Sequence, residues 1–223
     1  MPLIKVIEIG NAASIGVWEI DESINELVGQ LNLDEQEFEE LYSFKSDYRK
    51  KQWLSYRLLI KTMVKVDTNY KICYSTSGKP FLINPPRIIS VSHSKSFSVV
   101  LISDNLYTRF GIDIELIDDK VARVKNKFIN KNELTLFSKE PSLELLTALW
   151  TAKEAIYKCF DLPGVSLKNN ILITHLWKEH NKYKIKAKLS IENSENIYLI
   201  NSLRIDNYML SHAEDITFKE IQK

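Results

Sequence analysis

Short stretches of alternating or β-branched apolar residues recur along the chain and predict strands. They occupy residues 16–20, 70–75, 87–92, 97–103, 111–115, 169–177 and 183–191. Two longer stretches repeat their apolar positions every three to four residues and predict helices at residues 46–65 and 142–160. Ser46 or Asp47 can cap the first helix, and Ser142 can cap the second. This mixture of strands and helices indicates an α+β fold.

The two predicted helices carry related sequences, and so do the strands ahead of them. WLSYRLLIK at residues 53–61 aligns with WTAKEAIYK at 150–158, and GVWEI at 16–20 aligns with GIDIE at 111–115. We interpret this as a duplication whose boundary lies near Asp104 and Asn105, which predicts subdomains of residues 1–104 and 105–223. Two similar α+β units pack most simply about a pseudo-two-fold axis, with a cleft between them.

The helix predicted at residues 142–160 has two different faces. One stripe of side chains is apolar and consists of Leu145, Leu149, Ala152, Ile156 and Phe160. Trp150, Glu154 and Lys158 form a second stripe, which does not have to face the core. A Glu and a Lys four residues apart most often form a surface ion pair worth roughly a few tenths of a kcal/mol. This pair alone therefore does not indicate a functional site.

Differences between the two copies point to chemistry in the second one. Strand alternation places Asp113 and Glu115 on one face, at positions where the first copy has apolar residues. Arg57 stands in the first copy at the position of Glu154. Three carboxylates without a nearby Cys or His form an oxygen-only set that suits Mg²⁺. The alternative is that Asp113 and Glu115 are the polar face of an edge strand.

The residues of interest in the first copy are basic: Arg49, Arg57, Lys79 and His93. Lys79 lies in the sequence SGKP, where Gly78 can adopt a positive φ and Pro80 fixes the exit of a turn. Such a turn exposes backbone amides to a flat or anionic ligand, or it simply connects a hairpin. His93 ends a predicted strand, and a histidine satisfied by structural hydrogen bonds is the alternative to a ligand-binding one.

Composition narrows the function classes. The 30 basic and 29 acidic residues nearly cancel, so no overall field attracts nucleic acid or a membrane surface. The longest purely apolar run is too short to span a bilayer, and two cysteines make no disulfide framework. We expect a cytoplasmic, monomeric protein with reduced thiols, a sizeable core and a local anion-binding site.

Together these motifs resemble the 4′-phosphopantetheinyl transferases, in particular the two-copy class similar to the surfactin-synthetase activator. Four motifs carry the resemblance: the Gly78-Lys79-Pro80 turn, the Ser92-His93 strand end, the Gly111–Glu115 strand and the Trp150–Lys158 helix. They occur in the family's order, between about Arg49 and Leu167. Residues 33–42 are acidic, whereas many relatives have a basic pair in this region.

The resemblance implies a holo-[acyl-carrier-protein] synthase type of enzyme, which serves fatty acid, polyketide or nonribosomal peptide biosynthesis. It would transfer the phosphopantetheine arm of coenzyme A to a serine of an apo acyl or peptidyl carrier protein. The site residues that it implies are Asp113, Glu115 and Glu154 for Mg²⁺, Asp113, Glu154 and Lys158 for catalysis, and Arg49, Arg57, Gly78, Lys79, Pro80, Ser92, His93 and Lys158 for coenzyme A. Arg49 or Arg57 would replace the missing basic pair at the 3′-phosphate.

Two other functions compete with this one. A Mg²⁺-dependent nuclease would also combine an Asp with a later Glu and Lys, but nuclease cores place Glu and Lys two apart on a strand. In this chain Lys158 follows Glu154 by a helical turn, and the balanced charge disfavours a DNA-binding surface. A non-catalytic homologue that only binds a carrier protein or nucleotide is disfavoured by the intact carboxylates and Lys158.

Overall fold

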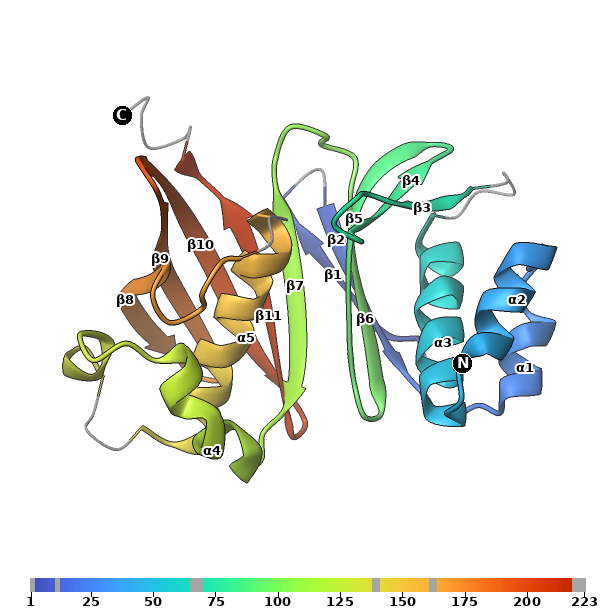
Figure 1. Ribbon diagram of the computed structural model, residues 1–223. Helices are drawn as coiled ribbons and strands as arrows, with labels where there is room; N and C mark the ends of the chain where they lie inside the picture. Colours follow the sequence, from blue (N-terminus) through green and yellow to red (C-terminus); the bar gives the residue numbers. More distant parts are fainter. Residues whose placement is uncertain (1–2, 11–12, 65–69, 138–140, 161–163, 218–223) are drawn as a thin grey trace.

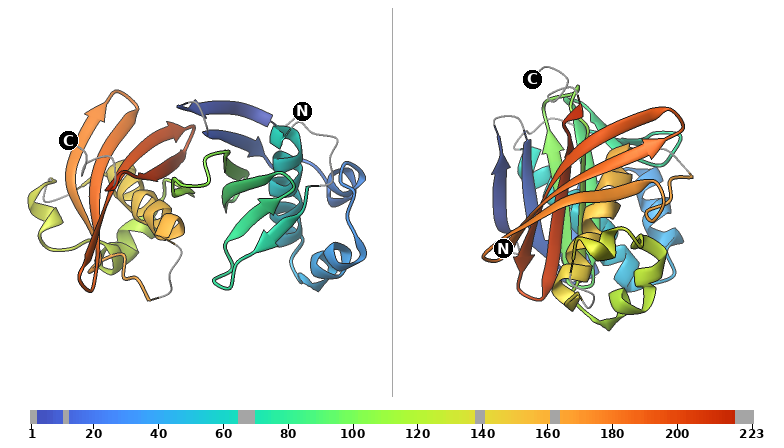
Figure 2. Two further views of the ribbon diagram at one scale, coloured as in Figure 1. Left: turned by 90° about the horizontal axis from the view of Figure 1, so that it is seen from above. Right: turned by 90° about the vertical axis from the view of Figure 1, so that its left-hand side faces the viewer.

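Two antiparallel sheets stand side by side, and a long helix packs on each of them (Figure 1). This computed structural model describes residues 3–10, 13–64, 70–137, 141–160 and 164–217. Strands before residue 104 belong to the first sheet, and strands after residue 109 belong to the second. Figure 2 shows the two parts of the chain on opposite sides of the molecule. The fold is therefore α+β, as the hydrophobic pattern predicts.

The first sheet has six strands in the order β1-β2-β6-β5-β4-β3. Its strands are β1 (Leu3–Ile9), β2 (Ala13–Glu19), β3 (Ile72–Tyr74), β4 (Pro80–Ile83), β5 (Pro86–Ser94) and β6 (Phe97–Ser103). Three helices precede β3, namely α1 (Ile24–Gly29), α2 (Glu35–Ser43) and α3 (Asp47–Val64). Helix α3 coincides with the helix predicted at residues 46–65 and packs on the sheet through a cluster that includes Leu54, Leu59 and Val100.

The second sheet has five strands in the order β7-β11-β10-β9-β8. Its strands are β7 (Phe110–Leu116), β8 (Ile171–Glu179), β9 (Lys182–Ile191), β10 (Ser194–Ile205) and β11 (Tyr208–Asp215). The helical elements are α4 (Asp119–Phe128), the 3₁₀ helix η1 (Glu133–Thr135) and α5 (Leu143–Phe160). The hydroxyl of Ser142 accepts the Leu145 N–H and so caps α5, as predicted.

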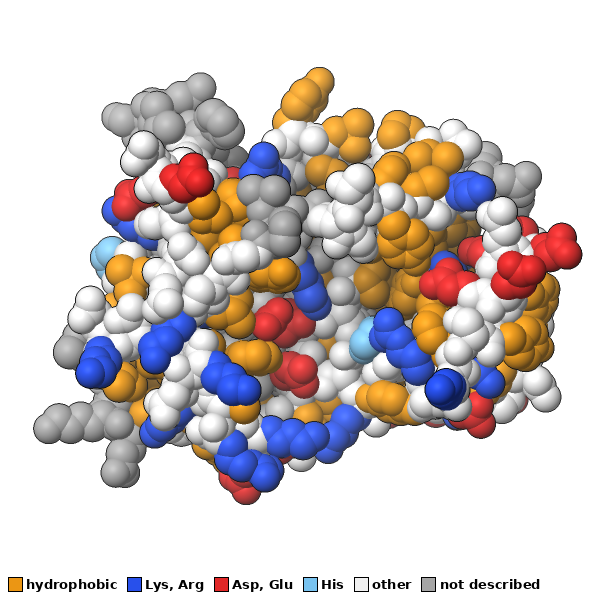
Figure 3. All heavy atoms as spheres, in the orientation of Figure 1, with side chains coloured by type: hydrophobic (Ala, Val, Ile, Leu, Met, Phe, Trp, Pro, Cys, Tyr) orange, Lys and Arg blue, Asp and Glu red, His pale blue; other side chains and the backbone are white. Residues whose placement is uncertain are grey.

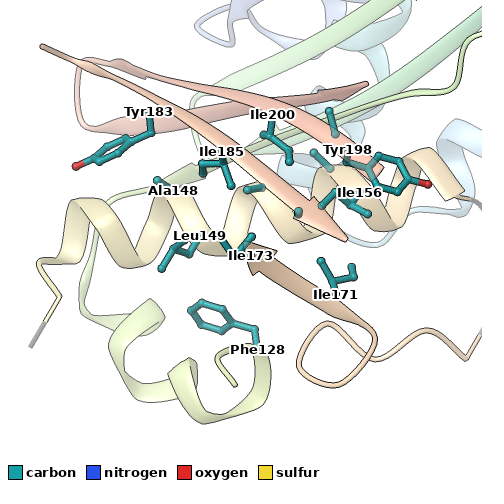
Figure 4. Packing of buried hydrophobic residues seen from close by; sticks show 14 of the residues in the cluster. Phe128, Ala148, Leu149, Ile156, Ile171, Ile173, Tyr183, Ile185, Tyr198 and Ile200 are labelled. Atoms are coloured by element: carbon teal, nitrogen blue, oxygen red, sulfur yellow. The ribbon is translucent and has the colours of Figure 1, made fainter. Parts of the chain in front are cut away.

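Helix α5 covers the second sheet with the apolar stripe that its periodicity predicts. Leu149, Ala152 and Ile156 are buried in one cluster with Ile173 and Ile200 of the sheet (Figure 4). The partly buried Leu145 and Phe160 pack against the edge of this cluster. Burial of a large apolar side chain contributes roughly 1.5–3 kcal/mol, so this stripe fixes the rotation of α5 about its axis.

A third apolar cluster joins the two sheets. It contains Val17 of β2 and Val99 of β6 from the first sheet, with Ile112 and Ile114 of β7 and Leu210 of β11 from the second. Without β1, both sheets have the same strand order, with the first strand of the unit next to the last. That order is what a duplication would produce, while the pseudo-two-fold axis and the subdomain division at residues 104 and 105 stay predictions.

Candidate active site

Strand β7 places two carboxylates on the side of the sheet that α5 covers. Ile112 and Ile114 point into the cluster between the sheets, whereas Asp113 and Glu115 line a cavity together with residues of α5. The alternation predicted from the sequence GIDIE is therefore present, with Asp113 buried and Glu115 half-buried.

Gly111 allows α5 to approach β7 closely. A Cβ atom added to Gly111 would lie only 2.0 Å from the carbonyl oxygen of Ala155 and 2.7 Å from the amide nitrogen of Cys159. Only glycine fits such a contact between a strand and a helix backbone. The close approach brings Glu154 and Lys158 over the carboxylates of β7.

The resulting cavity has a volume of about 480 Å³ and receives residues from both halves of the chain. Its lining residues are Arg49 of α3, Val91, Ser92 and His93 of β5, Asp113 and Glu115 of β7, and Trp150, Glu154 and Lys158 of α5. In Figure 3 acidic side chains lie in the hollow between the halves, opposite a histidine and basic side chains. The second stripe of α5, predicted from its spacing, therefore faces a cleft rather than bulk solvent.

Asp113 is held by one of its two carboxylate oxygens. Its Oδ1 accepts a hydrogen bond of 2.7 Å from the Ser92 hydroxyl and forms an ion pair of 2.8 Å with the Lys158 ammonium. Its Oδ2 is buried and has no hydrogen-bond partner among the described residues. A buried carboxylate oxygen without a partner is costly, so Oδ2 is suited to an incoming cation or donor.

The carboxylates of the cavity are crowded. Burial, followed by the charge of Asp113, raises the pKa of Glu154 to about 7. Burial also raises the pKa of Glu115, although the Ser94 hydroxyl donates a hydrogen bond of 2.7 Å to its Oε2. Lys158 compensates only part of this negative charge, and a further cation would relieve the repulsion.

Divalent cations were the sequence-based expectation for Asp113, Glu115 and Glu154. Within the described residues, no group of three or more His, Cys, Asp or Glu side chains is gathered closely enough to hold a metal ion. The donors nevertheless suit Mg²⁺, because all three are carboxylates that line one cavity and Asp113 Oδ2 has no hydrogen-bond partner among the described residues. Mg²⁺ usually takes one or two protein carboxylates and completes its shell with waters and phosphate oxygens. The three-residue ligand set stays a prediction.

Arg49 and His93 form a hydrogen-bonded pair on the opposite wall. The Arg49 Nη1 atom lies 2.5 Å from His93 Nε2. Burial, followed by the charges of Arg49 and Lys158, lowers the pKa of His93 to about 4. His93 is therefore neutral at pH 7, and its Nε2 accepts the hydrogen bond from Arg49 while Nδ1 carries the proton.

Arg57, which the resemblance implies for coenzyme A, does not line this cavity. Its guanidinium forms ion pairs with Glu37 and Glu40 of α2, at 3.3 and 3.5 Å, and stacks over the Trp53 ring. Arg57 is only 3% exposed and lines a different hollow. The acidic segment at residues 33–42 supplies these partners, and their carboxylates neutralise the charge of Arg57.

The sequence SGKP forms the connection between β3 and β4. Gly78 has φ of +86°, and the backbone closes with hydrogen bonds from Gly78 N to Ser75 O and from Ser75 N to Lys79 O. Lys79 and Pro80, like Gly78, do not line the cavity. The Lys79 ammonium instead donates to the carbonyl oxygen of Cys159 at 3.2 Å, next to Lys158, so this turn lies beside the end of α5.

The sequence interpretation missed Lys153, which is fully buried beside Glu154. Its ammonium forms an ion pair of 2.8 Å with Glu133 and donates to the carbonyl oxygens of Phe128, Leu167 and Ile171 at 2.7–3.0 Å. These contacts fasten the segments around α5 to the helix. The sequence does contain a signal for this role of Lys153. It lies beside the apolar stripe of the helix, and a charged residue in such a position needs buried partners.

A smaller hollow of about 350 Å³ adjoins the cavity and shares His93, Glu115 and Trp150 with it. Its other walls are Tyr48, Ser94, Lys95, Leu116, Asp118, Lys120, Val121, Val124 and Thr147. The Trp150 ring, which lines both hollows, meets the Phe128 ring edge-to-face with 5.1 Å between centroids. Of the two adjoining spaces, the cavity is the more charged and the smaller hollow is the more apolar.

Fold and site together define an α+β protein with a cleft between two sheets. The cleft has acidic side chains on one wall and basic side chains on the other, which suits a phosphate-containing ligand. The family model of the 4′-phosphopantetheinyl transferase superfamily matches residues 109–208, less than half of the 223-residue chain. This stretch contains β7 and α5, and so Asp113, Glu115, Glu154 and Lys158. No curated protein matches the chain. Among the described residues, no helix is both long and apolar enough to cross a membrane.

Proposed function

We propose that this protein transfers the 4′-phosphopantetheine arm of coenzyme A to a serine of an apo acyl or peptidyl carrier protein. The observation that carries this proposal is the convergence of three carboxylates and Lys158 with Arg49 and His93 in one cavity. The matching family model supports phosphopantetheine transfer in general. The holo-[acyl-carrier-protein] synthase type and the two-copy class belong to this proposal.

The reaction is a displacement at the β-phosphorus of coenzyme A. The serine oxygen forms a bond to this phosphorus, the bond to the bridging oxygen breaks, and adenosine 3′,5′-bisphosphate leaves with the electron pair. Lys158 stabilises charge on the pyrophosphate from its position beside Asp113. Glu154, which lines the same cavity, accepts the serine proton, directly or through a water.

Asp113, Glu115 and Glu154 would hold Mg²⁺ together with the pyrophosphate, since they are the oxygen donors of the cavity. The bound cation would neutralise phosphate charge. Asp113 then serves as the anchor, because its free Oδ2 is already buried and fixed by the contacts of Oδ1. Glu115 and Glu154 complete the acidic wall from β7 and α5.

The remaining parts of coenzyme A follow from the shape of the cleft. We assign the 3′-phosphate to Arg49 and His93, and the adenine to the backbone around Gly78, Lys79 and Pro80 beside the end of α5. The phosphopantetheine arm would occupy the adjoining, more apolar hollow. Residues 1–104 would thus bind the nucleotide, and residues 105–223 would hold the metal and pyrophosphate.

Incubation with coenzyme A, Mg²⁺ and several apo carrier proteins, followed by intact mass measurement, tests the proposal. We expect one phosphopantetheine group to be added to at least one carrier, and we expect Asp113→Ala and Glu154→Ala to abolish the addition while retaining the fold. Failure of the parent protein to modify any carrier would exclude the transferase function. Full activity of either variant would exclude the assigned carboxylate roles.

A further inference from the structure

Strand β7 is an edge strand of the second sheet, yet its free edge is not left unpaired. In an antiparallel strand, alternate backbone N–H groups point to opposite edges. The N–H groups of Asp113 and Glu115 face β11, whereas those of Ile112 and Ile114 point away from it. Edge groups of this kind need a partner when they are buried.

Two of three serine side chains on one face of β5 supply the partners for this edge. Ser90, Ser92 and Ser94 alternate along the strand, so all three point the same way, and all are buried. The Ile112 N–H donates to Ser90 Oγ at 3.1 Å, and the Ile114 N–H donates to Ser92 Oγ at 3.4 Å. Hydroxyl groups from the first sheet therefore replace a neighbouring strand at the edge of the second sheet.

Two of the three hydroxyls also hold the carboxylates. Ser92 donates to Asp113 Oδ1 and Ser94 donates to Glu115 Oε2, both at 2.7 Å. Ser92 and Lys158 both contact Oδ1, so the buried Oδ2 of Asp113 is left without a hydrogen-bond partner among the described residues. Ser90 accepts a backbone N–H of β7 but contacts neither carboxylate. Its role is therefore structural only.

We propose that Ser92 and Ser94 are positioning residues that aim the Asp113 and Glu115 carboxylates at the cation. This inference rests on the proposed function, and it replaces the coenzyme A-binding role that the resemblance implies for Ser92. Its physical basis is that a charge-assisted hydrogen bond fixes the rotamer of a carboxylate, and metal affinity depends on such outer contacts. The acidic site is then complete only when β5 of the first sheet is docked on β7 of the second.

Manganese binding separates positioning from structure. Titration of the protein with Mn²⁺ alone, followed by electron paramagnetic resonance of the free ion, should show affinity lowered about 10- to 100-fold in Ser92→Ala and Ser94→Ala. Ser94→Thr keeps a hydroxyl and should restore most of the affinity. Ser90→Ala is the matched control, because it lies on the same strand and face, and it should bind Mn²⁺ like the parent. Equal affinity in all variants, or an equal loss in Ser90→Ala, overturns the proposal.

Hydrogen exchange of the metal-free protein tests the contacts without any metal. Loss of one backbone hydrogen bond should accelerate exchange at Ile112 in Ser90→Ala and at Ile114 in Ser92→Ala by about 5- to 10-fold. Ser94→Ala should leave both amides unchanged, because its hydroxyl touches only Glu115. Unchanged exchange in all variants would refute the contacts themselves. If the amides of Ile112 and Ile114 exchange faster as expected but the parent protein binds no Mn²⁺, the metal site and the positioning role are refuted. Transfer of the phosphopantetheine arm is not refuted by that result.

Discussion

At the scale of single residues, the cavity holds more negative charge than its own cations neutralise. Asp113 takes the ammonium of Lys158, and Glu154 has no cation of its own within hydrogen-bond reach among the described residues. Burial and the charge of Asp113 therefore raise the pKa of Glu154 to about 7, above its ordinary value of 4.5. Such a group stabilises the folded state while protonated and loses that effect as the pH rises.

Glu154→Gln should therefore stabilise the metal-free protein at pH 8. The folded state binds more protons than the unfolded state between pH 4.5 and about 7, so stability falls as the pH rises through this window. Removing the charge should raise the free energy of unfolding by about 1–3 kcal/mol at pH 8, allowing for partial solvent screening. It should have little effect at pH 4. Urea denaturation at both pH values measures this difference.

The control for this prediction is Glu144→Gln, because Glu144 already has Lys178, Tyr183 and Arg204 as partners. These partners lower the pKa of Glu144, so its substitution should destabilise the protein at pH 8. A destabilised Glu154→Gln variant at pH 8 would contradict the electrostatic account of the cavity.

Arg49 and Arg57 provide a matched test of which residue binds the 3′-phosphate, with Arg57 as the control. Parent enzyme should use dephospho-coenzyme A about 10- to 100-fold less well than coenzyme A, because charged hydrogen bonds contribute roughly 1.5–3 kcal/mol. Arg49→Ala and His93→Ala should narrow the difference in kcat/KM between the two donors. Arg57→Ala should lower the melting temperature, because it leaves Glu37 and Glu40 without this partner, but it should preserve the donor ratio.

A ratio of two donors on one protein sample does not depend on the folded fraction. If the ratio of kcat/KM for the two donors is unchanged in Arg49→Ala, Arg49 does not bind the 3′-phosphate. A narrowed ratio in Arg57→Ala would instead require α2 to release its arginine when coenzyme A binds.

At the scale of elements, the contact between β7 and α5 sets the geometry of the site. Gly111 is the position where the two backbones meet, and its aligned residue Gly16 faces the helix α3. At Gly16 an added Cβ would meet side-chain atoms, namely Met63 Sδ at 2.5 Å and Leu59 Cδ1 at 2.7 Å. Side chains can move aside, whereas the Ala155 carbonyl cannot do so without moving α5.

Gly111→Ala should therefore be severely destabilising, by about 3 kcal/mol or more, whereas Gly16→Ala should cost clearly less. Urea denaturation of both variants measures the difference in the free energy of unfolding. Any folded Gly111→Ala protein should also lose transfer activity, because Glu154 and Lys158 belong to α5 and would be displaced with it. Similar stability losses in the two variants would show that the β7–α5 contact is not special.

At the scale of the whole molecule, the net charge of +1 hides a local basic surface. Lys120, Arg123 and Lys127 are exposed on α4, and Lys120 lines the hollow next to the candidate active-site cavity. A carrier protein that is acidic around its modified serine would meet this surface. Contacts between exposed charges are weak and screened by salt.

Raising the ionic strength should therefore raise the KM for the carrier more than the KM for coenzyme A. Lys120→Glu and Arg123→Glu should each raise the carrier KM with little effect on the coenzyme A KM. Lys182→Glu is the control, because Lys182 is exposed on β9, three strands away from β7. Equal salt responses for both substrates would remove the electrostatic part of carrier docking.

Several features of the molecule could be predicted from the sequence because they depend on local periodicity. The two-residue period of β7 determines that Asp113 and Glu115 share a face, and the helical period of α5 separates its apolar stripe from Trp150, Glu154 and Lys158. Strand β11 was not predicted, because α5 covers one of its faces and the first sheet covers the other. A strand buried on both faces shows no alternation.

Tertiary structure alone decided which partner each polar side chain meets. Arg57 lies on a helical face that the sequence leaves undefined, and only the docking of α2 gives it Glu37 and Glu40. Ser92 and Ser94 contact Asp113 and Glu115 because two sheets meet, although 21 residues separate each pair in the chain. Periodicity specifies the direction in which a side chain leaves its own element, whereas its partner depends on how separate elements pack.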